Sequence, residues 1–367
     1  MIKMRILHVF ASLDRGGAES RIMDIYRKID KEIIQFDFIV NDSKKQYVYV
    51  DEIKNLGGNV FYIPNKHIQG YFSYKKIWKR LLINHPEWQI LHIHHTSNAA
   101  AYVGVAKKLG RKVIVHSRTA GGDSSFKSVI KQLTRYPLRY QADYLFACSK
   151  NAATWMFGKK SEKALVIQNA IDIEPFIFNE ATRDEVRKAL KLEDKLVIGH
   201  IGRFSVAKNH RFLINVFDKI LKLEPNAILL LVGDGPLRGQ IENQINIMGM
   251  KDRVILTGVR CDAASLLQGM DLFLFPSLFE GLPGSVIEAQ SAGLPCLISD
   301  TITNEVLITD LVKTLSLNLD SKEWAKTAIL SAKNSLRQNT RAKISAAGFD
   351  ANNVADTLTE FYIEIVN

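Results

Sequence analysis

The sequence predicts an α/β protein made of two doubly wound domains that face each other across a cleft. At 367 residues the chain is too long for one ordinary hydrophobic core and suits two domains. Short apolar runs alternate with amphipathic segments of helical length, a pattern typical of parallel strands joined by helices. The alternation begins again after Asn169, which indicates a second sheet. We expect an N-terminal domain at 1–170, a C-terminal domain at 171–349, and a last helix at about 350–367 that packs back on the first domain.

The apolar runs define the expected strands in chain order. In the first domain they are Arg5–Val9, Phe36–Val40, Val60–Ile63, Ile90–His94, Val113–His116, Tyr144–Cys148 and Leu165–Ile167. In the second they are Leu196–Ile201, Ala227–Val232, Val254–Thr257, Leu272–Phe275 and Cys296–Ile298. The polar segment 178–195 suits a connector or surface helix. The first run is short and interrupted by His8, so it predicts a strand rather than a signal peptide.

Composition favours a globular enzyme. Hydrophobic residues make up 47% of the chain and charged residues 24%. The three cysteines, Cys148, Cys261 and Cys296, are far apart and form no CxxC pair, which argues against a disulfide framework or a zinc knuckle and fits a reducing compartment. No run of 18 apolar residues occurs, so we expect no transmembrane helix.

Positive charge is concentrated in the first half of the chain. Residues 1–170 hold 28 Lys and Arg against 13 Asp and Glu, a net charge of +15, whereas the rest holds 21 against 25, a net charge of −4. Between Ile53 and Gly122 there are 11 basic residues and one acid, Glu87. Such a field attracts phosphate-bearing partners: nucleic acid, anionic lipid or a charged substrate. A solubilising surface is the simpler alternative.

Two glycine-containing loops follow expected strands, where doubly wound sheets bind their ligands. Gly16 and Gly17 precede a helix, so a phosphate could approach the backbone there, although a plain tight turn has the same pattern. The pattern is not GxGxxG, so a dinucleotide site is poorly supported. After the strand Leu196–Ile201, Arg203 and Lys208 could close on a diphosphate, although either could be a solvated side chain.

A glycine and proline turn follows the strand Leu272–Phe275 and leads into a helix near Gly284. Its backbone amides and the Ser285 hydroxyl could bind phosphate, and Glu280 could accept hydrogen bonds from sugar hydroxyls. Glu288 lies just over one turn inside a helix that is otherwise apolar. A carboxylate in that setting is more often a ligand group than a solvated side chain, and a ribose diol is the expected ligand.

Three histidines, His92, His94 and His95, form an H-x-H-H pattern at a strand end, and H-x-H places two imidazoles on one face of the sheet. Residues 88–122 contain no carboxylate that could complete a metal site. We therefore expect these histidines to pack and form hydrogen bonds. No Asp-x-Asp pair occurs in the sequence either.

In combination, these motifs resemble glycosyltransferase family 4, most closely its bacterial exopolysaccharide and capsular polysaccharide enzymes. The resemblance covers nearly the whole chain and depends on the order of the motifs. The motifs are Gly-Gly-Ala-Glu at 16–19, Asn-Ala-Ile-Asp at 169–172, Gly-Arg-Phe with Lys-Asn-His at 202–210, Gly-Asp-Gly-Pro at 233–236, Glu280 and Glu288 spaced E-x7-E, and Glu-Ala-Gln-Ser-Ala-Gly-Leu-Pro-Cys-Leu-Ile-Ser-Asp at 288–300.

The resemblance implies the GT-B fold of two Rossmann-like domains and a hexosyltransferase that retains the anomeric configuration, with no metal or other cofactor. It implies that Arg203 and Lys208 hold the donor diphosphate and that Glu288 holds the ribose. Glu280 and His116 would act at the transferred sugar, His116 as a hydrogen-bonding group rather than a base. Assisting groups would be the diphosphate contacts Gly16, Gly17, Leu282, Pro283, Gly284 and Ser285, and the backbone of Val259 and Arg260 at the base.

One departure concerns Ala170, where the family usually has glycine. We expect an ordinary backbone conformation at that position.

The resemblance also implies partners and a location. The donor would be a nucleotide sugar, commonly a uridine one, bound by the C-terminal domain; the acceptor would be a polyprenyl-linked or other saccharide bound by the N-terminal domain. A basic stripe, Lys127, Lys131, Arg135 and Arg139, and the aromatic and basic segment 71–80 could contact anionic lipid or the acceptor, or could be solvated. We expect a cytoplasmic protein, peripheral at the inner face of the cell membrane, with no nucleic-acid partner.

Rival functions are a nucleotide-sugar 2-epimerase with the same architecture and a nucleic-acid or membrane-binding module driven by the basic half. The module would leave the paired glutamates and glycine loops unexplained. A dehydrogenase ranks last, because GxGxxG and its downstream acid are missing.

Overall fold

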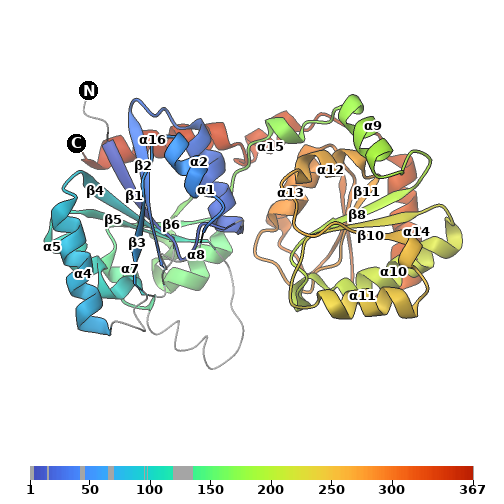
Figure 1. Ribbon diagram of the computed structural model, residues 1–367, viewed down its shortest axis with the longest axis horizontal. Coiled ribbons are helices and arrows are strands. Elements are labelled where there is room, and N and C mark those ends of the chain that lie inside the picture. The colour runs from blue at the N-terminus through green and yellow to red at the C-terminus, as the bar shows by residue number, and fades with distance from the viewer. Residues whose placement is uncertain are drawn as a thin grey trace. The chain divides into compact units, whose positions relative to one another are not determined.

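The structure, a computed structural model, describes residues 4–14, 16–41, 46–64, 70–94, 96, 98–118 and 135–366. The chain divides into two compact units, Met1–Ile171 with Gly348–Asn367, and Asp172–Ala347. We call them the N-terminal and the C-terminal unit. Each contains a parallel sheet with helices on both faces (Figure 1).

The sheet of the N-terminal unit has the strand order β3-β2-β1-β4-β5-β6-β7. Its strands are β1 (Met4–Val9), β2 (Ile34–Asn41), β3 (Val60–Ile63), β4 (Trp88–Ile93), β5 (Lys112–Ser117), β6 (Tyr144–Ala147) and β7 (Leu165–Val166). The register pairs His8 with His92 across β1 and β4. The order reverses between β1 and β4, the position at which doubly wound sheets bind ligands beyond their carboxyl ends.

Helices cover both faces of this sheet, so its strands are buried on both sides and have continuous apolar runs. One face packs against α1 and α16, and the other against α4, α5 and α8. The helices of the unit are α1 (Gly17–Lys28), α2 (Val50–Asn55), α4 (Tyr71–Asn84), α5 (Val103–Lys108), α7 (Leu138–Gln141), α8 (Lys150–Phe157) and α16 (Ala351–Val366).

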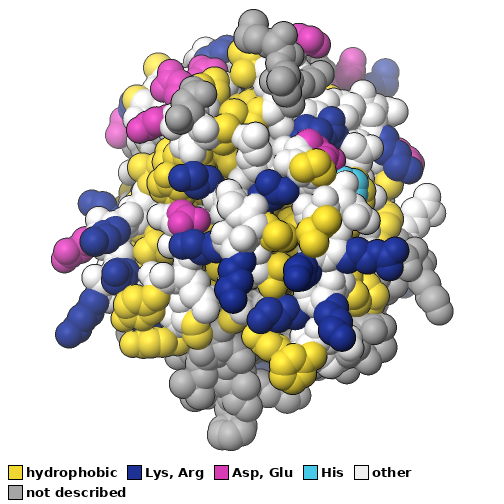
Figure 2. Space-filling model, turned by 90° about the vertical axis from the view of Figure 1, so that its left-hand side faces the viewer, with side chains coloured by type: hydrophobic (Ala, Val, Ile, Leu, Met, Phe, Trp, Pro, Cys, Tyr) yellow, Lys and Arg dark blue, Asp and Glu magenta, His cyan; other side chains and the backbone are white. Residues whose placement is uncertain are grey.

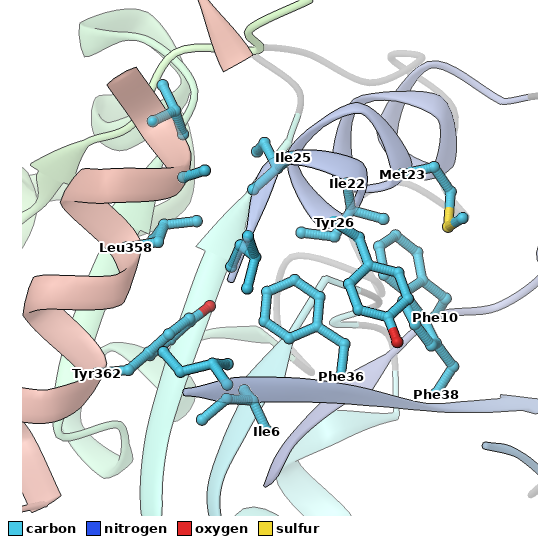
Figure 3. Close-up of a cluster of buried hydrophobic side chains, with 14 of the residues drawn as sticks. Ile6, Phe10, Ile22, Met23, Ile25, Tyr26, Phe36, Phe38, Leu358 and Tyr362 are labelled. Carbon is cyan, nitrogen blue, oxygen red and sulfur yellow. The ribbon is translucent and has the colours of Figure 1, made fainter. Parts of the chain in front are cut away.

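The last helix, α16, returns to the N-terminal unit and packs beside α1, as the sequence predicts. Figure 3 shows Leu358 and Tyr362 extending from α16 toward Ile6 and Phe36. Ile6, Phe36, Leu358 and Tyr362 are all fully buried. At about 25 cal/mol per Å² of apolar surface removed from water, each such large side chain contributes on the order of 2 kcal/mol to stability. The C-terminal helix is therefore part of the N-terminal core.

The C-terminal unit repeats the architecture with the strand order β10-β9-β8-β11-β12-β13. Its strands are β8 (Val197–Ile201), β9 (Ile228–Val232), β10 (Val254–Leu256), β11 (Leu272–Phe275), β12 (Cys296–Ser299) and β13 (Val312–Leu315). Its helices are α9 (Glu180–Ala189), α10 (His210–Leu223), α11 (Arg238–Ile247), α12 (Ala263–Gly269), α13 (Gly284–Ser291), α14 (Ser321–Asn334) and α15 (Arg341–Ala346). The order reverses between β8 and β11.

The structure confirms the predicted α/β class and the first strand near the amino terminus. It corrects the strand list in one place, because β13 was not predicted. This short edge strand is partly exposed along its whole length, so it lacks the apolar run that marks the other strands. Ala170 is fully buried and is not among the described residues with a positive φ, so its backbone is ordinary, as predicted. Among the described residues, no helix combines the length and apolar character needed to cross a bilayer.

Candidate active site

The predicted donor-binding residues of the C-terminal unit come from loops at the carboxyl ends of its strands. Lys208 ends a 3-10 turn, Val206–Lys208, after β8, and Glu280 lies in the turn after β11. β8 and β11 are neighbours in the sheet although more than 70 residues separate them in sequence. The fold therefore brings these two predicted site residues together.

Lys208 and Glu280 form an ion pair, with Nζ of Lys208 2.7 Å from Oε1 of Glu280. Their side chains are only 15% and 17% exposed. The ammonium also lies 4.4 Å from the centre of the Phe275 ring, in cation–π distance. Because both partners are largely withdrawn from water, their attraction is less screened than that of a surface pair. The result is a fixed cation and a fixed carboxylate at the switch point of this sheet.

Tight backbone packing shapes the loop that carries Lys208. A Cβ on Gly233 would lie 2.1 Å from the carbonyl oxygen of Gly202, and Gly233 has a φ of +138°. Gly233 also donates its amide hydrogen to the Gly258 carbonyl at 2.9 Å. The loops that follow β8, β9 and β10 thus meet through the backbone of three glycines, Gly202, Gly233 and Gly258.

Arg203, the second predicted cation, is exposed and makes no ion pair with any residue that the structure describes. Its side chain is thus available to a ligand, but the structure does not hold it beside Glu280. Arg203 and Lys208 therefore differ: Lys208 is fixed before a ligand arrives, and Arg203 is not.

The turn after β11 leads into α13, which begins at Gly284, as predicted. Pro283 is the N-cap and supplies no side-chain hydrogen bond to the first amides of the helix. Free amides at a helix N-terminus attract anions. Leu282, Gly284 and Ser285 are partly buried around this N-terminus, so the predicted phosphate contacts lie on one short segment.

Glu288 lies on α13 between residues that are fully buried, Ile287 and Ala289, while its own side chain is partly exposed. Val259 and Arg260 follow β10 and are exposed. The Arg260 guanidinium binds Asp262, with Nε and Nη2 2.8 and 2.6 Å from its two carboxylate oxygens. That pairing occupies the side chain and leaves the backbone, which the sequence predicts as the base contact. These roles stay predictions.

Two buried histidines, His200 and His210, lie close to the Lys208 loop, and the sequence motifs predict no role for either. His200 donates from Nδ1 to the Leu274 carbonyl at 2.9 Å, while its Nε2 has no partner among the described residues. His210 begins α10, and neither of its ring nitrogens has a partner in the part of the chain that the structure describes. Burial lowers the pKa of His200 well below its usual value and that of His210 to about 4. Both are therefore neutral at pH 7 and add no charge to the Lys208 site.

In the N-terminal unit, Gly16 is the N-cap of α1 and Gly17 is its first residue. The Glu19 carboxylate folds back over Gly16, where an added Cβ would lie 2.3 Å from Oε2. Glu19 also accepts a hydrogen bond from Ser12 at 3.2 Å, and burial raises the pKa of its carboxyl group. Apart from the adjoining residues and the backbone of its own helix, no described atom lies within 4 Å of the Cβ position of Gly17. The helix N-terminus therefore already holds a carboxyl group on one side, and the described residues leave space beside Gly17.

The strongest polar feature of this unit is a group of four buried histidines at the carboxyl ends of β1, β4 and β5. We call His8, His92, His94 and His116 the histidine network. Nδ1 of His8 lies 3.0 Å from Nε2 of His94, and Nε2 of His92 lies 3.0 Å from Nδ1 of His116. Burial lowers the pKa of all four imidazoles well below the usual value, so they are neutral near pH 7.

Two further side chains connect to the network. Arg118 donates from Nε to Nδ1 of His94 at 3.1 Å and from Nη1 to Asn169 at 2.9 Å. The hydroxyl of Tyr362 lies 2.6 Å from Nδ1 of His92. Burial lowers the pKa of the Arg118 guanidinium to about 10, and it has no ion-pair partner among the described residues.

The nitrogens of His8, His92 and His94 lie within 4.8 Å of one another, a spacing that a metal ion could use. Both ring nitrogens of His92 and of His94, however, are engaged in hydrogen bonds, and so is Nδ1 of His8. Only Nε2 of His8 has no partner among the described residues. A guanidinium in contact with the group also disfavours a second cation. We therefore interpret the three rings as part of a hydrogen-bond network, the role expected for His92 and His94.

Sequence reasoning found His116 but missed His8, Arg118 and Tyr362 as its neighbours. His8 could have been found, because it lies near the end of an expected strand, as His92 and His116 do. Tyr362 could not, because 270 positions separate it from His92.

The predicted membrane stripe is only partly described, because Lys127 and Lys131 lie outside the described residues. Arg135 stacks on Trp155, with its guanidinium carbon 5.2 Å from the ring centre, and Arg139 stacks on Tyr136 at 4.4 Å. Arg139 also donates to the Met156 carbonyl. Both arginines are partly buried. Packing within the unit therefore uses part of their surface.

Known structures share this fold over nearly the whole chain. HepE of Anabaena, solved in complex with UDP and glucose, has a TM-score of 0.78 at 19% identity, covering 98% of this chain and 99% of that one. A lipopolysaccharide glycosyltransferase, WaaG, has a TM-score of 0.67 at 16% identity and covers 99% of both chains. The fold is thus that of the GT-B glycosyltransferases.

Sequence comparisons place the chain within that class. The model for "Glycosyltransferase Family 4" matches residues 15–175, and the model for "Glycosyl transferases group 1" matches 195–334. The Bacillus subtilis protein named "Putative glycosyltransferase EpsF" is 33% identical over 98% of this chain and 96% of its own length. An Escherichia coli galactosyltransferase that uses UDP-Gal and a GlcNAc-diphosphoundecaprenol is 24% identical over 99% and 98%. The chain belongs to glycosyltransferase family 4 and is an enzyme that transfers a sugar.

Proposed function

We propose that the protein transfers a hexose from a UDP-sugar to a lipid-linked saccharide during the synthesis of an extracellular polysaccharide, with retention of configuration and without a metal. The observation that carries the donor half is the Lys208–Glu280 pair beside the open N-terminus of α13. The acceptor half is supported by the E. coli relative, whose name includes a diphosphoundecaprenol acceptor.

The ion pair suggests how the donor would be engaged. A diphosphate competes with Glu280 for the Lys208 ammonium, since both are anions at hydrogen-bonding distance from one cation. When Lys208 turns to the diphosphate, Glu280 is released to accept hydrogen bonds from the hydroxyls of the sugar. Arg203 and the amides at 282–285 complete the anion site, Glu288 binds the ribose, and the backbone at Val259 and Arg260 holds the base.

The transfer step then follows from charge. The bond between the anomeric carbon and the diphosphate oxygen breaks, and its electron pair leaves with the diphosphate, whose growing charge Lys208 and Arg203 stabilise. The sugar gains oxocarbenium character, which Glu280 stabilises. The acceptor hydroxyl attacks from the face of the leaving group, and its proton passes to a diphosphate oxygen. His116 donates or accepts a hydrogen bond at the sugar and does not act as a base.

A test is transfer from radiolabelled UDP-sugars to an undecaprenyl-diphosphate-linked saccharide, after thermal-shift screening of nucleotide sugars for stabilisation of the native protein. We expect one UDP-sugar to raise the unfolding temperature and to label the lipid fraction, with EDTA leaving the rate unchanged. A product epimerised at the sugar and formed without an acceptor would instead establish the 2-epimerase. Loss of transfer in EDTA, restored by a divalent ion, would contradict metal independence.

We also propose that the N-terminal unit binds an anionic membrane through α4 and α5. Lysines and arginines gather on the face shown in Figure 2, interspersed with exposed apolar groups. Phe72 is 79% exposed, which is unusual for phenylalanine. The exposed cations of α4, of α5 and of the first residue of β5 are Lys75, Lys76, Lys79, Arg80, Lys107, Lys108 and Lys112.

Changing Lys75, Lys76 and Lys79 to Glu should weaken binding to phosphatidylglycerol vesicles by at least tenfold, since each basic residue near such a surface contributes about 1 kcal/mol. The matched control changes three exposed lysines of α14, Lys322, Lys326 and Lys333, to Glu, which gives the same net charge. Vesicle sedimentation measures both. Equal losses in the two variants would show a dependence on total charge and would contradict a membrane-binding face on α4 and α5.

A further inference from the structure

A continuous chain of hydrogen bonds connects the C-terminal helix to His116. Tyr362 of α16 contacts Nδ1 of His92 at 2.6 Å, and Nε2 of His92 contacts Nδ1 of His116 at 3.0 Å. Nε2 of His116 is buried and has no partner among the described residues. The chain therefore begins at a tyrosine in the hydrophobic core and ends at an unpaired ring nitrogen at the carboxyl end of β5.

The protonation of this chain follows from counting hydrogens. A neutral imidazole carries one N–H and one lone pair, so each ring must donate on one side and accept on the other. Two directions are possible, and they leave opposite groups at Nε2 of His116. If Tyr362 donates to His92, His92 donates to His116, and His116 has its hydrogen on Nε2. If Tyr362 accepts, His116 has a lone pair there.

Burial selects the first direction. The Tyr362 hydroxyl is fully buried and has no second partner among the described residues. If it accepted from His92, its own O–H would be left without an acceptor in the core, which is costly. By donating, Tyr362 satisfies its hydrogen and leaves the chain with one unpaired group, the N–H of His116. The hydrogen bond on one ring nitrogen thus decides what the other nitrogen presents.

We propose that Tyr362 is a positioning residue: through His92 it holds His116 as the Nε2–H tautomer, so that His116 donates a hydrogen bond to a hydroxyl oxygen of the transferred sugar. This inference rests on the proposed function, which places His116 at that sugar. The unpaired buried N–H is the kind of group that a ligand completes. Donation rather than acceptance also explains why His116 needs no carboxylate to act.

The same unit contains an internal comparison. Arg118 has only donors, so it forces Nδ1 of His94 to accept; His94 then donates from Nε2 to Nδ1 of His8. This second chain is fixed by an arginine and does not depend on Tyr362. Removing the Tyr362 hydroxyl should therefore release the tautomers of His92 and His116 while those of His94 and His8 stay unchanged.

The first experiment is nitrogen NMR of the protein labelled with ¹⁵N-histidine, comparing the native sequence, Tyr362→Phe and Tyr26→Phe. The matched control Tyr26 is buried in the same core, where its hydroxyl donates to Gln35. We expect His116 to be protonated at Nε2 in the native protein and in Tyr26→Phe, and its ring shifts to change toward a tautomer mixture in Tyr362→Phe. An Nδ1–H tautomer in the native protein, or shifts of His116 that Tyr362→Phe leaves unmoved, would overturn the inference.

The second experiment is kinetic. We expect Tyr362→Phe to lower kcat about tenfold while the KM for the nucleotide sugar stays within twofold, the loss of one well-directed hydrogen bond. In the His116→Ala background the same change should cost nothing further, because its effect passes through His116. An equal loss in both backgrounds would show a purely structural role and overturn the proposal. If the native protein transfers no sugar, the proposed function fails, whereas the NMR result still decides the tautomer.

Discussion

The carboxyl ends of the two sheets carry opposite kinds of polar group. In the N-terminal unit, four imidazoles are buried and neutral, and hydrogen bonds join them in two pairs, His8 with His94 and His92 with His116. In the C-terminal unit, a lysine and a glutamate are fixed as an ion pair, with an exposed arginine on the same loop as the lysine. Both arrangements are built at the strand-order reversal of a doubly wound sheet. The same fold position can therefore carry either charged or neutral polar groups.

This difference matches the two halves of a sugar donor. A diphosphate carries full charge and gains more as it leaves, so a fixed cation stabilises the transition state most. Sugar hydroxyls are neutral, and they need donors and acceptors whose positions are set. A network of neutral imidazoles supplies such groups without adding a charge.

The largest expected effect is on catalysis at the charged end. Lys208→Ala should lower kcat/KM by about 100- to 1000-fold, the usual loss when one preorganised group at a developing negative charge is removed. The control is Lys219→Ala on α10, which removes a lysine paired with Asp218. Initial rates and thermal unfolding are measured on both variants. A native rate in the Lys208→Ala variant would contradict a role of the Lys208–Glu280 pair in catalysis.

The second effect concerns pH and the neutral end. Burial lowers the pKa of each imidazole in the histidine network below its value of 6.5, so the unfolded chain takes up protons that the native unit refuses. The stabilisation is complete above pH 6.5 and is lost as the pH falls below it, by up to about 1.4 kcal/mol per pH unit for each ring that stays neutral. The C-terminal unit has two such rings, His200 and His210. The loss of stability that His210 causes ends at about pH 4, where its ring also takes up a proton in the folded state.

Hydrogen exchange between pH 7.5 and 5.5, corrected for the intrinsic rate, would measure opening free energies in each unit separately. We expect the N-terminal unit to lose more stability over this range, because four of its described histidines are buried and neutral, against two in the C-terminal unit. Equal losses in both units, or a gain in the N-terminal unit on acidification, would show that the network binds protons in the folded state.

The third effect is on the stability of the C-terminal unit and concerns Gly233, whose backbone packs against Gly202 in the loop that carries Lys208. Gly233→Ala should destabilise the C-terminal unit by about 2 kcal/mol or more, because its positive φ strains any other residue and its Cβ would overlap the Gly202 carbonyl. Gly239→Ala is the matched control, since Gly239 lies within α11 and no described atom outside the backbone of that helix is within 4 Å of its Cβ position. Urea unfolding should give a lower free energy of unfolding for Gly233→Ala than for Gly239→Ala. Equal values would contradict the close approach of the loops that carry Gly202 and Gly233.

The sequence predicted the fold well because burial on both faces leaves a signal in every central strand. Each apolar run of the first half became a strand within two residues of its expected ends, whereas the partly exposed edge strand β13 left no such run. The candidate site was predictable where its residues follow strands in recognisable motifs, as Lys208 and Glu280 do. Their ion pair was not, because it requires β8 and β11 to be neighbours, which depends on the strand order.

The histidine network shows the same limit more clearly. His92 and His94 are close in sequence, and their shared face follows from the period of a strand. His8 and His116 join them through the register of three strands, and Tyr362 through the return of α16 to the first unit. Motifs of this kind are distributed over the whole chain, and only the folded topology assembles them.

The smallest expected change in stability concerns the glycine loop of the neutral end. Gly17 is the first residue of α1, has no positive φ, and has open space at its Cβ position. Gly17→Ala should therefore be neutral or stabilise the protein by about 0.5 kcal/mol, the reverse of Gly233→Ala. If the Gly17 amide contacts the donor phosphate, as the sequence predicts, the added methyl group should still lower the transfer rate about tenfold by holding the phosphate away from the backbone. Full activity in this stable variant would show that the loop at Gly16 and Gly17 is a tight turn that does not bind the phosphate. Only the C-terminal unit would then bind the donor diphosphate.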